Sequence, residues 1–121
     1  MNNKKLGTEF EREFCELLAG RGYWVHFITP AANGGQPFDV IAVKGGEAYA
    51  YDCKTSVSRQ FSIFRLEYNQ IFAFERWLAC GNNGPRVAVK YQGKVYIVFY
   101  TDLKERKTID LLEDAVCWGS L

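Results

Sequence analysis

Residues 36–54 read QPFDVIAVKGGEAYAYDCK, two short apolar runs separated by a lysine and two glycines. Residues 38–43 and 47–53 are rich in β-branched and aromatic side chains, which favours strands. The connection Lys44-Gly45-Gly46 is short enough to join the two runs as an antiparallel hairpin. This segment therefore predicts an antiparallel β-hairpin.

Three charged residues of this hairpin are expected to meet. Side chains alternate between the faces of a strand, so Asp52 and Lys54 point one way and Cys53 points the other. Pairing of the two strands brings Asp39 close to this acid and this lysine. Converging carboxylates repel each other unless a cation relieves them, and oxygen ligands suit Mg²⁺ or Mn²⁺. The pattern predicts a divalent-metal site for phosphodiester hydrolysis, where the lysine stabilises developing negative charge.

The remaining sequence predicts helices around this hairpin and a second hairpin after it. Strands are predicted over residues 23–28, 38–43, 47–53, 86–91 and 94–100, and helices over residues 5–21, 64–80 and 108–116. The loop at residues 29–37 has turn composition, and its Asn33, Gly34, Gly35 and Gln36 are candidates to approach a substrate backbone. This order predicts an α/β fold with a mixed central sheet flanked by helices.

The composition limits the class of protein. The 121 residues fit a single domain, and 48% hydrophobic with 24% charged residues is the profile of a folded chain. A net charge of +1 is low for a protein that neutralises phosphates, although basic residues can still gather on one face. The four cysteines contain no CxxC pair and are expected to be reduced. We find no signal-like or membrane-length apolar run, and therefore expect a cytoplasmic protein without a membrane partner.

The spacing of the charged residues resembles the signature of PD-(D/E)XK nucleases. The matching residues are QPFD at 36–39, twelve intervening residues, and DCK at 52–54. Upstream, GTEFER at residues 7–12 is similar to the glycine, apolar and Glu-Arg pattern of Holliday-junction resolvases. The resemblance covers residues 5–79.

This resemblance implies a restriction-endonuclease-like αβββαβ core and a role for each matching residue. It implies an endonuclease that cuts DNA, favours branched junctions and works as a homodimer. The implied metal ligands for Mg²⁺ or Mn²⁺ are Glu11, Asp39, Asp52 and the carbonyl of Cys53. Lys54 would be the lysine of the motif, and Gln70 matches a glutamine that lies near the site in such nucleases.

The sequence departs from this signature at two places. Pro37 is separated from Asp39 by Phe38, and the second acid is Asp52, where glutamate is more usual. Two other functions are compatible with the sequence: a repair or restriction-type nuclease on other DNA substrates, and an inactive nucleic-acid-binding module with the same fold. Mn²⁺ binding that depends on Asp39 would exclude the inactive module.

Each candidate also has an ordinary structural explanation. An Asp-x-Lys pair on a strand is usually a solvated ion pair worth at most about 1 kcal/mol. In the first helix Glu11 and Glu13 lie at the two borders of the apolar face, so Glu13 is the fallback for Glu11. The second hairpin is a candidate dimer interface or part of the core. Phosphate contacts beside the site are expected from a group of basic residues: Lys4, Lys5, Arg12, Lys44, Arg59 and Arg65.

Overall fold

The structure is a computed structural model that describes the backbone of residues 3–29 and 35–120 and the side chains of residues 7–29 and 35–119. The helices are α1 (Asn3–Gly20), α2 (Tyr68–Ala79) and α3 (Tyr100–Arg106), and the short 3-10 turns are η1 (Ile63–Arg65) and η2 (Trp118–Ser120). The strands are β1 (Trp24–Phe27), β2 (Val40–Lys44), β3 (Glu47–Ser56), β4 (Gln60–Ser62), β5 (Arg86–Tyr91), β6 (Lys94–Phe99), β7 (Thr108–Asp110) and β8 (Val116–Cys117).

A mixed sheet is present, as predicted; its described strands follow the order β1-β2-β3-β5-β6-β8, and β4 and β7 form a separate pair. The predicted hairpin is confirmed, because β2 pairs antiparallel with β3 from Val40 opposite Tyr51 to Lys44 opposite Glu47. Its turn, Gly45-Gly46, has φ values of 62° and 81°. Two consecutive positive φ angles are typical of the tight turns that match strand twist. Next to this hairpin, β3 pairs in parallel with β5.

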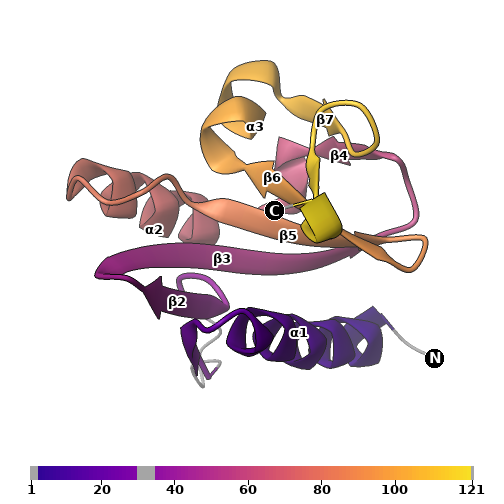
Figure 1. Ribbon diagram of the computed structural model, residues 1–121. Coiled ribbons are helices and arrows are strands. Elements are labelled where there is room, and N and C mark those ends of the chain that lie inside the picture. The colour runs from indigo at the N-terminus through magenta and orange to yellow at the C-terminus, as the bar shows by residue number, and fades with distance from the viewer. Residues whose placement is uncertain (1–2, 30–34, 121) are drawn as a thin grey trace.

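Helices cover both faces of the sheet (Figure 1). On one face, α1 buries Phe10, Phe14 and Leu18, which recur every fourth residue, against the side chains of β2, β3 and β6. On the opposite face, Phe74 of α2 and Leu103 of α3 are fully buried in a second cluster. The sheet therefore separates two cores, and its central strand β3 contributes side chains to both.

The end of the chain differs from the prediction. The expected helix at residues 108–116 is wrong: β7 pairs with β4, β8 pairs with β6, and a turn lies between them. Ile109 and Leu111 are both buried, which is the two-residue period of a strand. The carboxylate of Asp110 accepts hydrogen bonds from the backbone N–H groups of Leu112 and Glu113, which stabilises the turn. The predicted strand at residues 94–100 ends at Phe99, where α3 begins.

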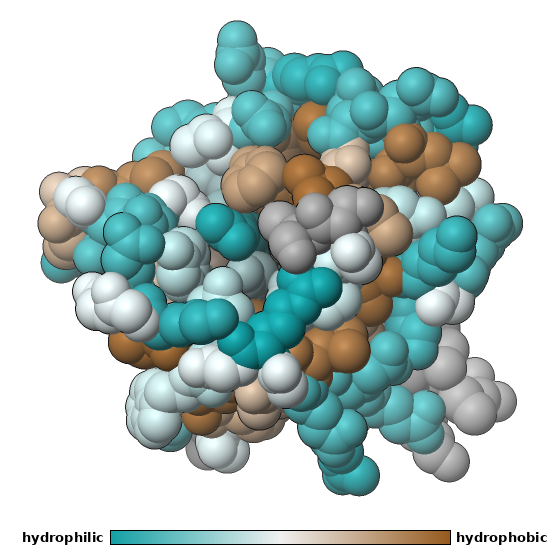
Figure 2. Space-filling view, viewed as in Figure 1, coloured by the Kyte–Doolittle hydropathy of each residue, from teal (hydrophilic) through white to brown (hydrophobic). Residues whose placement is uncertain are grey.

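The second predicted hairpin, β5 and β6, is confirmed, but its apolar side chains do not offer an interface. Val95, Tyr96, Ile97 and Val98 are at most 7% exposed because the two cores of the same chain bury them. The surface seen in Figure 2 intersperses hydrophobic and hydrophilic residues. Of the described helices, none has the length and apolar character needed to cross a membrane.

Candidate active site

The candidate site lies where β3 continues beyond the start of β2. The last backbone bond between the strands runs from the Asp39 N–H to the Tyr51 carbonyl, at 3.1 Å. Beyond this bond, the Asp39 side chain provides the hydrogen-bond acceptor that a neighbouring strand would otherwise provide. Its Oδ2 accepts a hydrogen bond from the Cys53 N–H at 2.8 Å. In a strand, the N–H and C=O of one residue point to the same side, so the Cys53 carbonyl faces this edge as well. A carboxylate and a backbone carbonyl thus lie together here.

Asp52 and Lys54 point to the face covered by α2, as their alternation predicted. The Lys54 Nζ lies 3.2 Å from Asp52 Oδ2, and the Asp52 side chain is fully buried. Gln70 of α2 joins the two, because its Nε2 donates to Asp52 Oδ1 at 3.1 Å and its Oε1 accepts from Lys54 Nζ at 3.3 Å. The same Oε1 accepts the Glu67 N–H at 2.9 Å. Gln70 thereby fixes the acid, the lysine and the first turn of α2 relative to one another.

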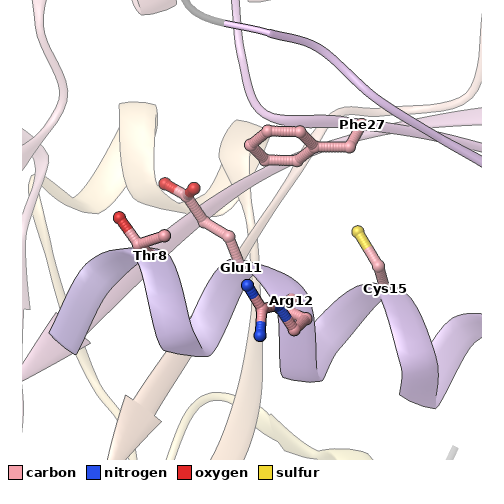
Figure 3. A pocket seen from close by; sticks show the side chains of 5 residues that line it. All are labelled: Thr8, Glu11, Arg12, Cys15 and Phe27. Atoms are coloured by element: carbon pink, nitrogen blue, oxygen red, sulfur yellow. The ribbon is translucent and has the colours of Figure 1, made fainter. Parts of the chain in front are cut away.

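Glu11 reaches the same place from α1. It lines a cavity of about 340 Å³ together with Asp39, Cys53, Lys54 and Gln70. It also lines a neighbouring cavity of about 320 Å³ with Thr8, Arg12, Cys15 and Phe27. In Figure 3 the Glu11 carboxylate rises from α1 on the same side as the Thr8 hydroxyl, below the ring of Phe27. The structure therefore brings together all five side chains that the sequence predicted.

The carboxylates of this group are incompletely compensated. Burial, and then the Asp39 carboxylate, raise the pKa of Glu11 to about 7 against the opposing effect of Lys54. Burial, and then Asp39, also raise the pKa of Asp52 well above its ordinary value despite the Lys54 ammonium beside it. Asp52 Oδ2 has no hydrogen-bond partner of good geometry in the described part of the chain. Acids in this state favour a cation near them.

The donor set is suited to a hard divalent cation. Carboxylate oxygens and a backbone carbonyl are the ligands that Mg²⁺ and Mn²⁺ prefer, and the cavity leaves room for water ligands. Among the described residues, no three acidic, histidine or cysteine side chains are already arranged as a metal-holding group. Asp39 and Asp52 instead hold protein donors, namely Cys53, Gln36 and Gln70. The residues fit such an ion, and binding it would exchange some of these donors for the metal.

Two residues support the site that the metal prediction did not include. The Gln36 Nε2 donates to Asp39 Oδ1 at 2.8 Å, and the backbone carbonyl of Gln36 accepts a hydrogen bond from the Asn69 side chain. This chain of contacts ties the segment before β2 to α2. Gln36 had been a candidate for substrate contact, but in the structure its amide orients Asp39. The position of Gln36 in the QPFD motif could have indicated a role beside Asp39. For Asn69, the sequence offers only its position next to Gln70.

Several other candidates lie elsewhere. Glu13, the fallback acid, points away and pairs with Lys90 at 2.6 Å. Arg59 pairs with Asp110 at 2.8 Å. Two other members of the predicted basic group lie closer to the site: Arg12 lines the cavity next to Glu11, and Arg65 donates to the carbonyl of Thr55, the residue after Lys54. Lys44 is distant, lining a separate cavity. Asn33, Gly34 and the side chains of Lys4 and Lys5 lie outside the described residues.

The architecture and this site define a class of protein. A mixed sheet between helices, with an acid and an acid-x-lysine pair on adjoining strands, is the restriction-endonuclease-like arrangement of PD-(D/E)XK nucleases. The sequence model of one family within this class, described as archaeal Holliday junction resolvase (Hjc), matches residues 2–116. The chain belongs to this family.

Two known proteins show the extent of the similarity. The crossover junction endodeoxyribonuclease Hjc of Methanocaldococcus jannaschii is 28% identical over 92 residues, which are 76% of this chain and 64% of that protein. The match thus spans slightly less than two thirds of that relative. The structure of Hjc from Archaeoglobus fulgidus, a Holliday junction resolvase, superposes with a TM-score of 0.71 over 92% of this chain and 95% of that chain. At 19% identity this second similarity concerns the fold.

Proposed function

We propose that this chain is a single-domain, divalent-metal-dependent endodeoxyribonuclease that cleaves four-way DNA junctions. The observation that carries the proposal is the group formed by Asp39, Asp52, Lys54 and Gln70 at the edge of β3, with Glu11 facing it. The negative charge of its buried acids is not fully balanced by the nearby lysine, and this lysine lines a cavity. The two similar proteins are named as a crossover junction endodeoxyribonuclease and a Holliday junction resolvase, which supports a DNA junction as the substrate.

Each residue has a role in this mechanism. Glu11, Asp39, Asp52 and the Cys53 carbonyl would hold Mg²⁺ or Mn²⁺, which supplies Lewis-acid polarisation of a phosphate and a more acidic bound water. Lys54 donates hydrogen bonds to phosphate oxygens as negative charge develops on them. Gln70 keeps the ammonium of Lys54 at this position, since its Oε1 accepts a hydrogen bond from the Lys54 Nζ. Arg12 is exposed beside Glu11 and would bind a neighbouring phosphate (Figure 3).

Four-way junctions offer two symmetry-related cleavage points, so two copies of the chain would act together. The surface that supports a homodimer is a row of aromatic side chains along η1 and α2. Phe64, Tyr68 and Phe72 stand four residues apart and are 92%, 92% and 65% exposed. Beside them a cavity of about 620 Å³ is lined by Ile63, Leu66 and Ile71 among others. An exposed apolar row of this kind is typical of a protein interface.

The test of the nuclease is cleavage of a labelled four-way junction and of a matching linear duplex in Mg²⁺ or Mn²⁺. Wild type should make symmetric, metal-dependent cuts in the junction, and Asp52→Asn and Lys54→Ala should not. Cleavage of both substrates would keep the nuclease and discard junction selectivity. Junction binding without metal-dependent cleavage would replace the proposal with the inactive binding module.

The test of the dimer is sedimentation of the Tyr68→Ser/Phe72→Ser double variant. Both side chains are exposed in the single chain, so folding should be retained while the mass falls from dimer to monomer. Trp24→Ser is the matched control, because Trp24 is 62% exposed on the edge strand β1 and is not part of the aromatic row. A wild-type protein that sediments as a monomer would exclude this interface.

A further inference from the structure

Another cavity, of about 360 Å³, lies beside Tyr51 on the face of the sheet that α1 covers. Its described lining contains three cationic side chains and no aspartate or glutamate. The lining residues are Arg21, Tyr23, Lys44, Tyr51, Arg86 and Trp118. They come from the turn after α1, the segment before β1, the end of β2, the middle of β3, the start of β5 and η2. Neither the metal site nor the proposed dimer row uses any of them.

Arg86 is the centre of this cavity. It lies opposite Tyr51 in the parallel β3/β5 pair, and its Nη1 donates to the Tyr51 hydroxyl at 3.1 Å. The guanidinium carbon lies 4.7 Å and 5.2 Å from the ring centres of Tyr49 and Phe99. Its Nε is buried without a hydrogen-bond partner in the described part of the chain. Arg86 also forms no ion pair with any described carboxylate.

This arrangement leaves the hydrogen-bonding capacity of Arg86 largely unused. Aromatic rings contact the faces of a guanidinium, whereas its five N–H groups lie in its plane and need acceptors. One acceptor, the Tyr51 hydroxyl, is present among the described residues. A half-buried charge with so few acceptors is costly unless an anion completes its environment. Packing against aromatic rings therefore explains where the Arg86 side chain lies, but it does not supply acceptors for most of its N–H groups.

The other cations form the walls. Lys44 Nζ donates to the Arg21 carbonyl at 2.6 Å, and its ammonium lies 5.2 Å from the ring centre of Tyr23. Arg21 donates to the Trp118 carbonyl at 2.7 Å and stacks on its ring at 4.0 Å. Glu47, across the turn from Lys44, is hydrogen-bonded to Tyr49 and does not line the cavity. Positive charge thus surrounds the space without a carboxylate among the described lining residues.

We propose that this cavity binds a phosphate group, with Arg86 and Lys44 as its charged ligands. A guanidinium presents paired donors that match two phosphate oxygens, and an ammonium adds a mobile point charge. This rests on the proposed function in one respect: the phosphate is assigned to the DNA strand that leads away from the cleaved bond.

The path between the two sites supports that assignment. Glu11 and Phe27 line the cavity beside the acids, and Arg21 and Tyr23 line the phosphate cavity, so α1 and β1 both run from one to the other. Glu11 lies nine residues before the end of α1 at Gly20, which is about 14 Å at 1.5 Å per residue, and Arg21 follows directly. A duplex strand carries one phosphate per 3.4 Å of its axis, so this distance corresponds to about four nucleotides.

The experiment measures binding only, so it does not depend on cleavage. Metal-free wild type, Lys44→Met and Arg86→Gln are titrated calorimetrically with inorganic phosphate, and their affinities for the four-way junction are measured over a range of salt concentrations. Lys104→Met is the matched control, because Lys104 is an exposed lysine on α3 that does not line the cavity. If Arg86→Gln does not fold, the exposed Lys44 still tests the site.

The expected result is saturable phosphate binding by wild type and the control, weakened at least about tenfold in both cavity variants, which is about 1.4 kcal/mol. For junction DNA, the slope of log K against log salt should become less steep by about 0.9 for each lost phosphate contact. Phosphate binding without a change in this slope would overturn the assignment to DNA. No phosphate binding and an unchanged slope would overturn the site altogether, leaving Arg86 as a packing residue. If the variants change the slope but the wild-type protein never cleaves DNA, the proposed nuclease activity is wrong and the phosphate site is retained.

Discussion

On the α2 side of β3 the buried carboxylate of Asp52 lies near Asp39, while on the α1 side the guanidinium of Arg86 lies among aromatic rings. The first site contains acids, held by a lysine and two glutamine side chains. The second site contains cations, with no carboxylate among the described residues of the cavity. Tyr51 and Asp52 are adjacent in sequence, and they point to opposite faces of the same strand.

This contrast explains why net charge was a poor guide to the partner. A total of +1 averages an acidic site and a cationic site that lie on different parts of the molecule. A nuclease needs both signs, because acids bind the metal and cations bind the phosphates of the strand. DNA binding depends on where the charges lie along α1 and β3, and the net charge of the sequence does not contain this information.

The largest effect is expected from removing one acid. Asp39→Asn should lower metal-dependent cleavage at least about 10³-fold, because a neutral amide binds a divalent cation poorly. Folding should survive, since the asparagine oxygen can still accept the Cys53 N–H. Calorimetric titration with Mn²⁺ should show the loss of binding directly.

Asp102→Asn is the control for this variant, because Asp102 is an exposed acid at the start of α3. It should bind Mn²⁺ and cleave like wild type. Full activity in Asp39→Asn would break the comparison, because the acidic site would then have no chemical function.

A smaller effect is expected from the residue that positions the lysine. Gln70→Met removes the hydrogen bonds to Asp52 and Lys54 while keeping the side-chain length. We expect kcat to fall about 10- to 100-fold, the range typical of residues that orient metal ligands, with junction affinity unchanged. Single-turnover cleavage and binding measurements separate the two quantities.

Gln60→Met is the matched control, since the Gln60 amide donates to Asp110 instead of to the acids. Its cleavage rate should equal that of wild type. Equal losses in the two variants would mean that Gln70 contributes only general stability.

The smallest effect concerns stability without metal. The folded-state pKa of Glu11 is raised from 4.5 to about 7, so the folded protein holds this proton more tightly than the unfolded chain does. Stability should therefore fall as pH rises from about 4.5 through 7. Because Glu11 is half-exposed, solvent screening limits the effect to about 1 kcal/mol.

Glu11→Gln removes this cost. At pH 8 and without metal, the variant should resist urea better than wild type by about 1 kcal/mol, and its stability should depend less on pH. The exposed Glu9→Gln variant is the control and should leave the pH dependence unchanged. A Glu11→Gln variant that is less stable than wild type at pH 8 would contradict the idea that the acids repel each other.

The central hairpin could be predicted because its signals are local. The two-residue period of β2 and β3 and the glycines of their turn fix which side chains meet, so Asp39, Asp52 and Lys54 could be grouped from sequence alone. Gln70 and Glu11 needed the family resemblance, since nothing local relates a helix residue to a distant strand.

Other features depend on contacts distant in sequence. The short α3 begins where a strand was expected, because Tyr100 and Leu103 are buried among residues of other elements. β7 is recognisable once β4 pairs with it across about fifty positions of sequence. The cationic cavity draws its residues from six separate segments, so no motif in the sequence could reveal it.

The two-residue turn at Gly45-Gly46 has a consequence for the protein engineer. Adding a single residue there would shift the register and rotate the second acid to the opposite face of the sheet. The length of this turn therefore fixes the position of Asp52 relative to Asp39. Tags, linkers or grafted loops are better inserted at Gln92-Gly93, the exposed turn between β5 and β6, which sets no distance within the acid group.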